Sequence, residues 1–328
     1  MPSWTGGTDR RRLLGAALAA AAFAGLPAAA FAQGKPLRVV TTTAHVADAA
    51  KRVGGDRVAV ENLLGEGVDP HLYKPTRSDI AKLSGADLVL ASGLHLEAQF
   101  DDVLRQLERT RPVLLVAERL PRDRLLAAPN YPDRFDPHVW MDPALWTSVV
   151  DAVRDALAAR DPAGAAAFEA NAAAYKAEIA RLADYARQAT ATVPPERRVL
   201  VTAHDAFAYL GRAFGLEVMG IQGLSTESEA GLRRIEELVS LLVERTVGAV
   251  FVETSVSDAN IRALIEGAGA RGQRVAIGGE LFSDALGPPG SYEGTWTGML
   301  DHNVTAIVQA LGGDAPAGGF QGKLNGAS

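Results

Sequence analysis

The chain contains no cysteine among its 328 residues. Disulfide bonds and thiolate metal sites are therefore excluded, and so is a lipid attached to an N-terminal cysteine. The chain also lacks H-E-x-x-H, the helical motif in which two histidines bind zinc and a glutamate acts as general base. Any metal site must therefore use imidazole and carboxylate groups, and we expect a protein that is not lipid-anchored.

The apolar run at the N-terminus is too short to span a membrane. It covers Leu13–Leu26 and ends at Pro27, whereas a transmembrane helix needs roughly 20 apolar residues. Arginines precede the run and Ala30-Phe31-Ala32 follows it, an order that is typical of a secretory signal peptide. We expect residues 1–32 to be a signal peptide for export to the periplasm, by the general or the twin-arginine route.

Acidic residues outnumber basic ones, with 39 Asp and Glu against 33 Lys and Arg and a net charge of −6. Removal of residues 1–32, which hold three Arg and one Asp, makes the mature chain more acidic still. An acidic surface disfavours a nucleic-acid partner. The chain beyond residue 32 is longer than one hydrophobic core usually accommodates, so we expect two domains.

Short β-branched runs alternate with helical patterns, which predicts βαβ units and parallel sheets. The alternation occurs twice along the chain. The first set of predicted strands is Leu37–Thr42, Arg57–Leu63, Asp87–Ala91 and Val113–Val116. The second set is Arg198–Ala203, Leu216–Ile221, Gly248–Val252 and Arg274–Ile277.

One long helix is predicted between the two sets, over residues 161–192. Pro162 stands in its first turn, and neither Gly nor Pro occurs from Ala165 to Thr192. We therefore expect an α/β fold of two similar lobes, residues 33–160 and 193–328, with central, mostly parallel sheets. The long helix joins the lobes and leaves a cleft between them.

Three of the six histidines follow predicted strands. His71 and His138 each stand in the triplet Asp-Pro-His, and His204 follows Ala203. In open α/β sheets the loops at the carboxyl ends of strands form the ligand crevice. Proline fixes its own φ and holds the preceding residue extended, which restrains the imidazole that comes next. Each histidine alone would more often have a structural role, but three in equivalent loops favour a shared ligand site.

Several segments resemble one known family. Gly67–Leu88 (GVDPHLYKPTRSDIAKLSGADL) is similar to the signature of the zinc and manganese substrate-binding proteins of ABC importers, cluster A-I. Further segments resemble the same family in the same order: Asp136–Pro143, Thr202–Phe207, Gly223–Glu229, Phe251–Glu253, Leu281–Gly287 and Met299–Val304. The resemblance implies a non-enzymatic protein that delivers a metal ion to a membrane permease. It is compatible with a periplasmic metallochaperone as a further partner, and it implies a monomer with no nucleic-acid partner.

In that family four side chains, two from each lobe, bind one metal ion in the cleft. The resemblance places these ligands at His71, His138, His204 and Asp284. Three imidazoles and one carboxylate suit tetrahedral Zn²⁺, and manganese-type relatives carry a carboxylate where this chain has His204. We expect one Zn²⁺ per chain, with Mn²⁺ or iron as the alternative. A zinc-dependent hydrolase, which needs an open water position, is the alternative of another class.

Other residues near these ligands are less specific. Residues 118–136 contain no histidine, so the His-rich loop that many zinc members carry is absent. Three acids beside the ligands are expected to accept a hydrogen bond from an imidazole or to cap a turn: Asp69, Asp136 and Asp205. A structural role is expected for the two histidines that follow other strands, His45 and His95.

Overall fold

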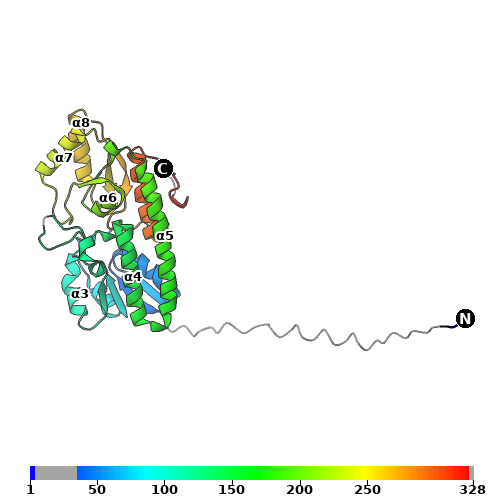
Figure 1. Cartoon of the computed structure of the whole chain (residues 1–328). Helices are drawn as coiled ribbons and strands as arrows, with labels where there is room; N and C mark the ends of the chain where they lie inside the picture. Colours follow the sequence, from blue (N-terminus) through cyan, green and yellow to red (C-terminus); the bar gives the residue numbers. More distant parts are fainter. Residues whose placement is uncertain (4–34, 130, 325–328) are drawn as a thin grey trace. The chain divides into compact units, whose positions relative to one another are not determined.

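Four parallel strands form the sheet of the first lobe in the computed structural model, which describes residues 1–3, 35–129 and 131–324 (Figure 1). The spatial order is β2-β1-β3-β4, and every pair is parallel. The strands are β1 (Leu37–Thr41), β2 (Val58–Asn62), β3 (Leu88–Ala91) and β4 (Val113–Leu115). The signal peptide predicted over residues 1–32 lies outside the described residues, apart from residues 1–3.

The second lobe repeats this arrangement with two parallel pairs. They join β5 (Val199–Thr202) to β6 (Glu217–Gly220) and β7 (Ala249–Glu253) to β8 (Ala276–Leu281). Because β5 also contacts β7, the order β6-β5-β7-β8 matches that of the first lobe. The predicted α/β fold of two similar lobes with parallel sheets is confirmed.

Strand β8 departs most from its prediction, because it continues past Ile277 to Leu281. Gly278 and Gly279 lie inside it, and glycine has a low strand propensity. The structure gives the reason for Gly278: a Cβ atom there would lie 2.8 Å from the Cβ of Ala310 and 3.0 Å from the Phe251 ring. The close approach of a helix to the strand therefore requires a residue without a side chain.

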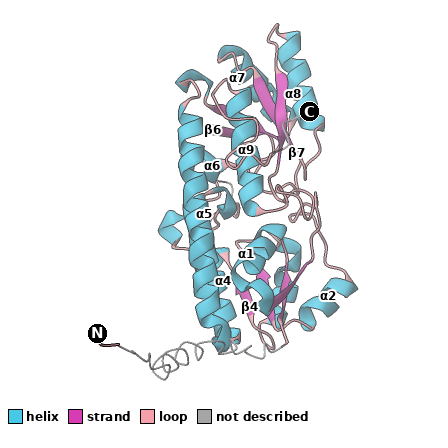
Figure 2. Cartoon of the chain, turned by 90° about the vertical axis from the view of Figure 1, so that its right-hand side faces the viewer, coloured by secondary structure: helices cyan, strands magenta, loops and turns pink. Residues whose placement is uncertain are grey.

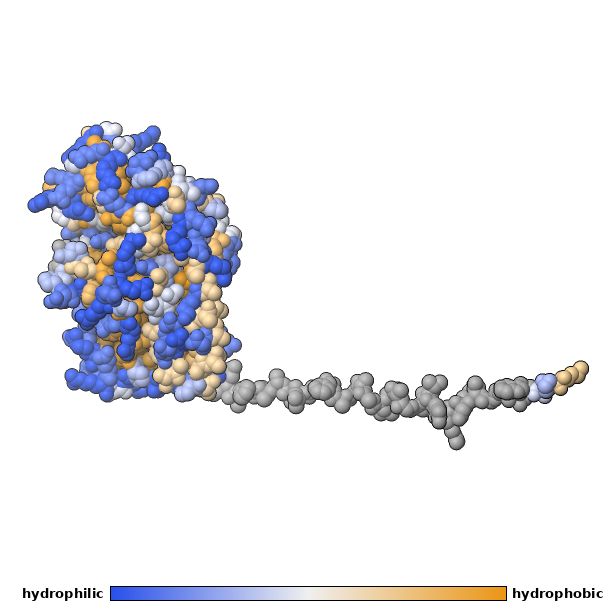
Figure 3. All heavy atoms as spheres, viewed as in Figure 1, coloured by the Kyte–Doolittle hydropathy of each residue, from blue (hydrophilic) through white to orange (hydrophobic). Residues whose placement is uncertain are grey.

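Helices pack around both sheets. Those of the first lobe are α1 (Ala44–Gly54), α2 (Arg77–Ser84), α3 (Asp101–Leu107) and α4 (Pro143–Arg160). Those of the second are α6 (Ala208–Phe214), α7 (Leu232–Glu244), α8 (Ala259–Ala270) and α9 (Trp296–Ala310). None of the helices in the described part of the chain has both the length and the apolar composition that a membrane crossing needs. Hydrophilic residues cover much of the face that Figure 3 shows.

Helix α5 (Ala165–Ala191) is the long helix that the sequence predicts between the lobes (Figure 2). Its buried apolar and aromatic residues recur every three or four positions and so share one face: Phe168, Ala172, Tyr175, Ile179, Leu182, Ala186 and Ala189. That face packs on α1 and α4 and also on α6 and α9, so that residues of both lobes share one apolar cluster, beside which each lobe has a smaller cluster of its own. Residues from Pro36 onward form one compact unit, and the lobe boundaries 33–160 and 193–328 stay predictions.

A buried polar cluster ties the lobes to α5. The Tyr175 hydroxyl donates to Oδ2 of Asp48 at 3.0 Å and accepts from Nε1 of Trp146 at 3.2 Å. The same Asp48 oxygen accepts from the backbone N–H of Trp296 at 3.2 Å. Trp296 stacks on Trp146 with 5.7 Å between ring centroids. Since Trp296 starts α9 in the second lobe, the cluster fixes the lobes relative to each other.

Replacing Tyr175 by Phe should lower the free energy of unfolding by about 1–3 kcal/mol, because buried Asp48 and Trp146 each lose a hydrogen-bond partner. Urea unfolding at constant pH measures the change. Tyr185→Phe is the matched control on the same helix, since that hydroxyl lies 2.9 Å from Thr305 in a half-buried position. The control should lose less stability, and equal losses in the two variants would contradict this account.

Candidate metal centre

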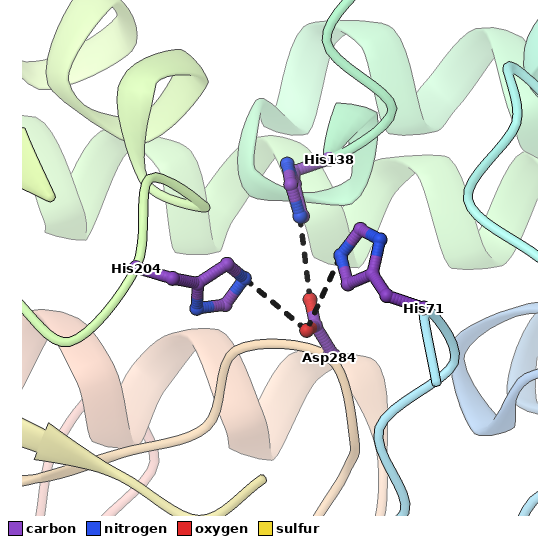
Figure 4. A group of neighbouring side chains, drawn as sticks. All are labelled: His71, His138, His204 and Asp284. Atoms are coloured by element: carbon purple, nitrogen blue, oxygen red, sulfur yellow. Dashed lines mark ion pairs between the residues drawn. The ribbon is translucent and has the colours of Figure 1, made fainter. Parts of the chain in front are cut away.

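The four predicted ligands come from loops at the carboxyl side of the strands. His71 lies between β2 and α2, and His138 lies between β4 and α4. His204 follows β5, and Asp284 follows β8. Parallel strands present their carboxyl ends at one edge of a sheet, so the loops of each lobe meet. The structure brings one ligand atom from each side chain to within 4.8 Å of the others (Figure 4).

The atoms that face one another are buried and have no hydrogen-bond partner among the residues that the structure describes. They are Nε2 of the three histidines and both carboxylate oxygens of Asp284. The Nε2 atoms of His71, His138 and His204 lie 3.7, 3.4 and 3.2 Å from these oxygens. Tetrahedral ligands about 2.0–2.1 Å from Zn²⁺ lie about 3.3–3.4 Å apart. Because buried polar atoms need a partner, the arrangement fits one small metal ion.

Two further carboxylates orient two of the imidazoles. Oδ1 of Asp136 accepts from Nδ1 of His138 at 2.7 Å and from its backbone N–H at 2.9 Å. Glu253 accepts from Nδ1 of His204 at 2.6 Å and from its backbone N–H at 2.9 Å. A proton on Nδ1 leaves the lone pair on Nε2, which is the usual state of a histidine that binds a metal.

Sequence reasoning found one of these two orienting groups. Asp136 orients an imidazole as expected. Asp69 instead caps a turn, because its Oδ1 accepts from the backbone N–H of His71 at 2.8 Å. The side chain of Asp205 makes no hydrogen bond within the described residues, and the partner of His204 is Glu253 instead. Glu253 ends β7, which lies beside β5. A carboxylate at the end of the neighbouring strand was the available signal.

Two further histidines, His45 and His95, lie close to this site but are not part of the cluster of four side chains. His45 is fully buried and stacks on Trp140 with 4.6 Å between ring centroids. Trp140 in turn packs edge-on against the His138 ring at 5.3 Å. His95 borders a cavity that His71 also lines.

The charges in the site are strongly coupled. Burial alone would raise the pKa of Asp284, but the imidazoles around it lower that pKa well below its usual value. Burial alone would lower the pKa of His138, yet Asp136 and Asp284 raise it to about 9. In the same way, Glu253 and Asp284 outweigh burial and raise the pKa of His204 well above its usual value. Two imidazoles of the metal-free protein are therefore charged at neutral pH.

His71 differs from the other two imidazoles. Burial lowers its pKa to about 3, against the attraction of Asp284, so its ring is neutral at physiological pH. Metal ions bind only neutral imidazole. An ion bound by all three imidazoles would therefore meet a neutral ring at His71 and would have to displace protons from His138 and His204.

Metal affinity should therefore rise with pH up to about 9, and binding at pH 7 should release about two protons. Calorimetric titrations in buffers of different ionisation enthalpy count those protons.

The raised pKa values of His138 and His204 also stabilise the metal-free fold below pH about 6.5, and this contribution is lost as pH rises toward about 9. Unfolding of the metal-free protein at several pH values checks that sign. A stability that stays constant over this pH range, or metal binding without proton release, would show that both imidazoles are already neutral in the metal-free protein.

Comparison with known proteins gives the family. A family model described as zinc-uptake complex component A, periplasmic, matches residues 39–310. This chain belongs to that family of metal-binding substrate-binding proteins of ABC importers. It is 48% identical over 275 residues to manganese-binding lipoprotein MntA of Bacillus subtilis, covering 84% of this chain and 90% of that protein.

A second relative is named for a different metal. The chain is 45% identical over 282 residues to zinc-binding protein TroA of Treponema pallidum, covering 86% of this chain and 91% of that protein. The solved structure of the periplasmic zinc-binding protein TroA matches with a TM-score of 0.82 at 44% identity, over 84% of this chain and 99% of that one. The predicted fold and the predicted family are thus confirmed.

Membership also confirms the coarse function. Proteins of this family are extracytoplasmic, bind metal ions and work with the permease and ATPase of an ABC importer rather than as enzymes. The two relatives are named for manganese and for zinc. The names of the relatives therefore do not decide which metal this substrate-binding protein carries, and the choice depends on its own candidate ligands.

Proposed function

We propose that this substrate-binding protein, exported by way of residues 1–32, captures one Zn²⁺ per chain as a monomer and delivers it to the permease. The proposed ligands are His71, His138, His204 and Asp284. The observation that carries the proposal is the nitrogen-rich set of three buried Nε2 atoms and one carboxylate within 4.8 Å. Zn²⁺ binds such sets as a tetrahedron, whereas Mn²⁺ suits carboxylate, carbonyl and water oxygens.

The burial of the site supports binding rather than catalysis. A catalytic zinc keeps one position open for water and has a free general base nearby. Here four protein side chains converge, with exposures of 3% for His71, 2% for Asp284 and 0% for the other two. The neighbouring carboxylates of Asp136 and Glu253 are already acceptors for ligand imidazoles. A zinc-dependent hydrolase therefore has less support.

Manganese is the second candidate, and two observations favour it. A relative as similar as MntA is named for manganese. Both oxygens of Asp284 also have no hydrogen-bond partner in the described part of the chain, so the carboxylate can bind through both oxygens and raise the coordination number above four.

Elemental analysis of the protein purified from its own host gives the metal, and competition titration gives the stoichiometry. We expect one tight Zn²⁺ per chain, because the described residues contain one cluster of suitable ligands. His302→Gln is the matched control: His302 lies on α9, where its Nε2 is 2.9 Å from the carbonyl oxygen of Glu280. It should bind one Zn²⁺ like the wild type. Two tight sites per chain would contradict the proposal.

His204 should set the preference for zinc over manganese. Replacing it by Glu leaves two nitrogens and two carboxylates, which narrows the ratio of zinc to manganese affinity by about one to two decades. The new carboxylate would face Glu253, so Glu253→Gln is combined with His204→Glu to remove the repulsion. Glu253→Gln alone is the control. Competition titrations with both ions measure the ratio, and an unchanged ratio would remove His204 from the selectivity residues.

A further inference from the structure

A small cavity opens beside one of the four proposed ligands. Its volume is about 70 Å³, and His71 is the only one of the four that lines it. Apolar side chains form much of its wall, among them Leu94, Phe135 and Leu224. A cavity needs only about 10–15 Å³ of such volume to hold one water molecule, so a partly hydrated cation fits. From this side an incoming ion meets His71 first.

His95 borders the same cavity on an unusual backbone segment. Gly93, Leu94 and His95 have φ values of 84°, 53° and 62°. Non-glycine residues in this left-handed region cost about 1–3 kcal/mol each and persist where the surroundings hold them. Buried Glu97 holds this segment, because its carboxylate accepts from the backbone N–H groups of Ser92 at 2.8 Å and Gly93 at 3.1 Å. Such strain is typical of functional sites.

The ring of His95 is oriented as a metal ligand would be. Its Nδ1 lies 2.7 Å from Oδ2 of Asp101 at the start of α3, and a proton on Nδ1 leaves Nε2 as the atom that can bind a metal ion. The side chain is 45% exposed, so it can meet an ion in solution. Glu227 lines the cavity from the second lobe and accepts from Nε2 of Gln99 at 3.0 Å. Its negative charge attracts cations to this opening.

We propose that His95 is an entry ligand, which binds the arriving Zn²⁺ through Nε2 and passes it across the cavity to His71. The step exchanges one neutral imidazole or water ligand for another, so the ion keeps its oxidation state. The inference rests on the proposed function, because it takes the four buried side chains as the final ligands. Since His95 is outside that set, it changes the rates of loading and release and leaves the equilibrium affinity unchanged.

The test compares rates and affinity in full-length variants. His95→Gln should slow the loading and the release of Zn²⁺ by the same factor, at least about threefold, a change within the range seen among variants of one binding site. Stopped-flow mixing with Zn²⁺ alone gives the loading rate, and transfer to a fluorescent chelator gives the release rate. Asp101→Asn keeps the His95 ring but removes the carboxylate beside it. This variant should slow both rates less than His95→Gln does. His302→Gln, which changes a histidine outside the cavity, should keep wild-type rates.

Wild-type rates in His95→Gln would overturn the inference. So would a fall in affinity that matches the fall in loading rate, because it would indicate a structural role or a fifth final ligand. Equal slowing in His302→Gln would also overturn it. A titration of the wild type comes first: if it binds no Zn²⁺, the proposed function fails and the inference falls with it. If it binds one Zn²⁺ and His95→Gln loads at the wild-type rate, only the inference fails.

Discussion

The attraction between the buried carboxylate of Asp284 and three imidazoles is the interaction on which the site depends. A buried carboxylate costs several kcal/mol unless a positive charge compensates it. Protons on His138 and His204 supply that charge in the metal-free protein, and a divalent cation held by the proposed ligands would supply it in the loaded one. Protons and a metal ion would therefore compete for the same Nε2 atoms.

The surrounding structure holds this carboxylate in register with ligands from the other lobe. Nε1 of Trp140 donates to the carbonyl oxygen of Ser283 at 2.9 Å, one residue before Asp284. The carbonyl of Trp140 accepts from Nε1 of Trp296 at 2.9 Å. Both bonds are buried and cross from one lobe to the other. With α5 packed on both lobes, the ligand loops rest on a shared core, which disfavours a wide hinge motion and leaves local loop movement as the route for exchange.

The same framework serves relatives that are named for manganese and for zinc. A fold that hosts different cargoes cannot itself explain the choice of metal. The choice must come from the donor atoms and from the groups that orient them. In this chain Asp136 and Glu253 orient two imidazoles and increase their basicity, which favours metal binding. The same contacts raise the pKa values of those imidazoles, so they also make metal binding depend on pH.

The sequence by itself determined most of the elements and predicted the candidate ligands. Strand and helix patterns are local, so periodicity and the Pro162 signal located seven strands and α5 closely. The four candidate ligands, which the structure brings together, followed from motifs that resemble a family, and Asp136 was found because it stands two residues from His138. Only the tertiary structure decided which groups surround them. Glu253 lies 49 residues from His204. The end of strand β8 was missed because it contains Gly278, which a helix contact requires, and the cavity beside His95 is built from both lobes. These features depend on contacts between residues far apart in the chain, which local patterns do not encode.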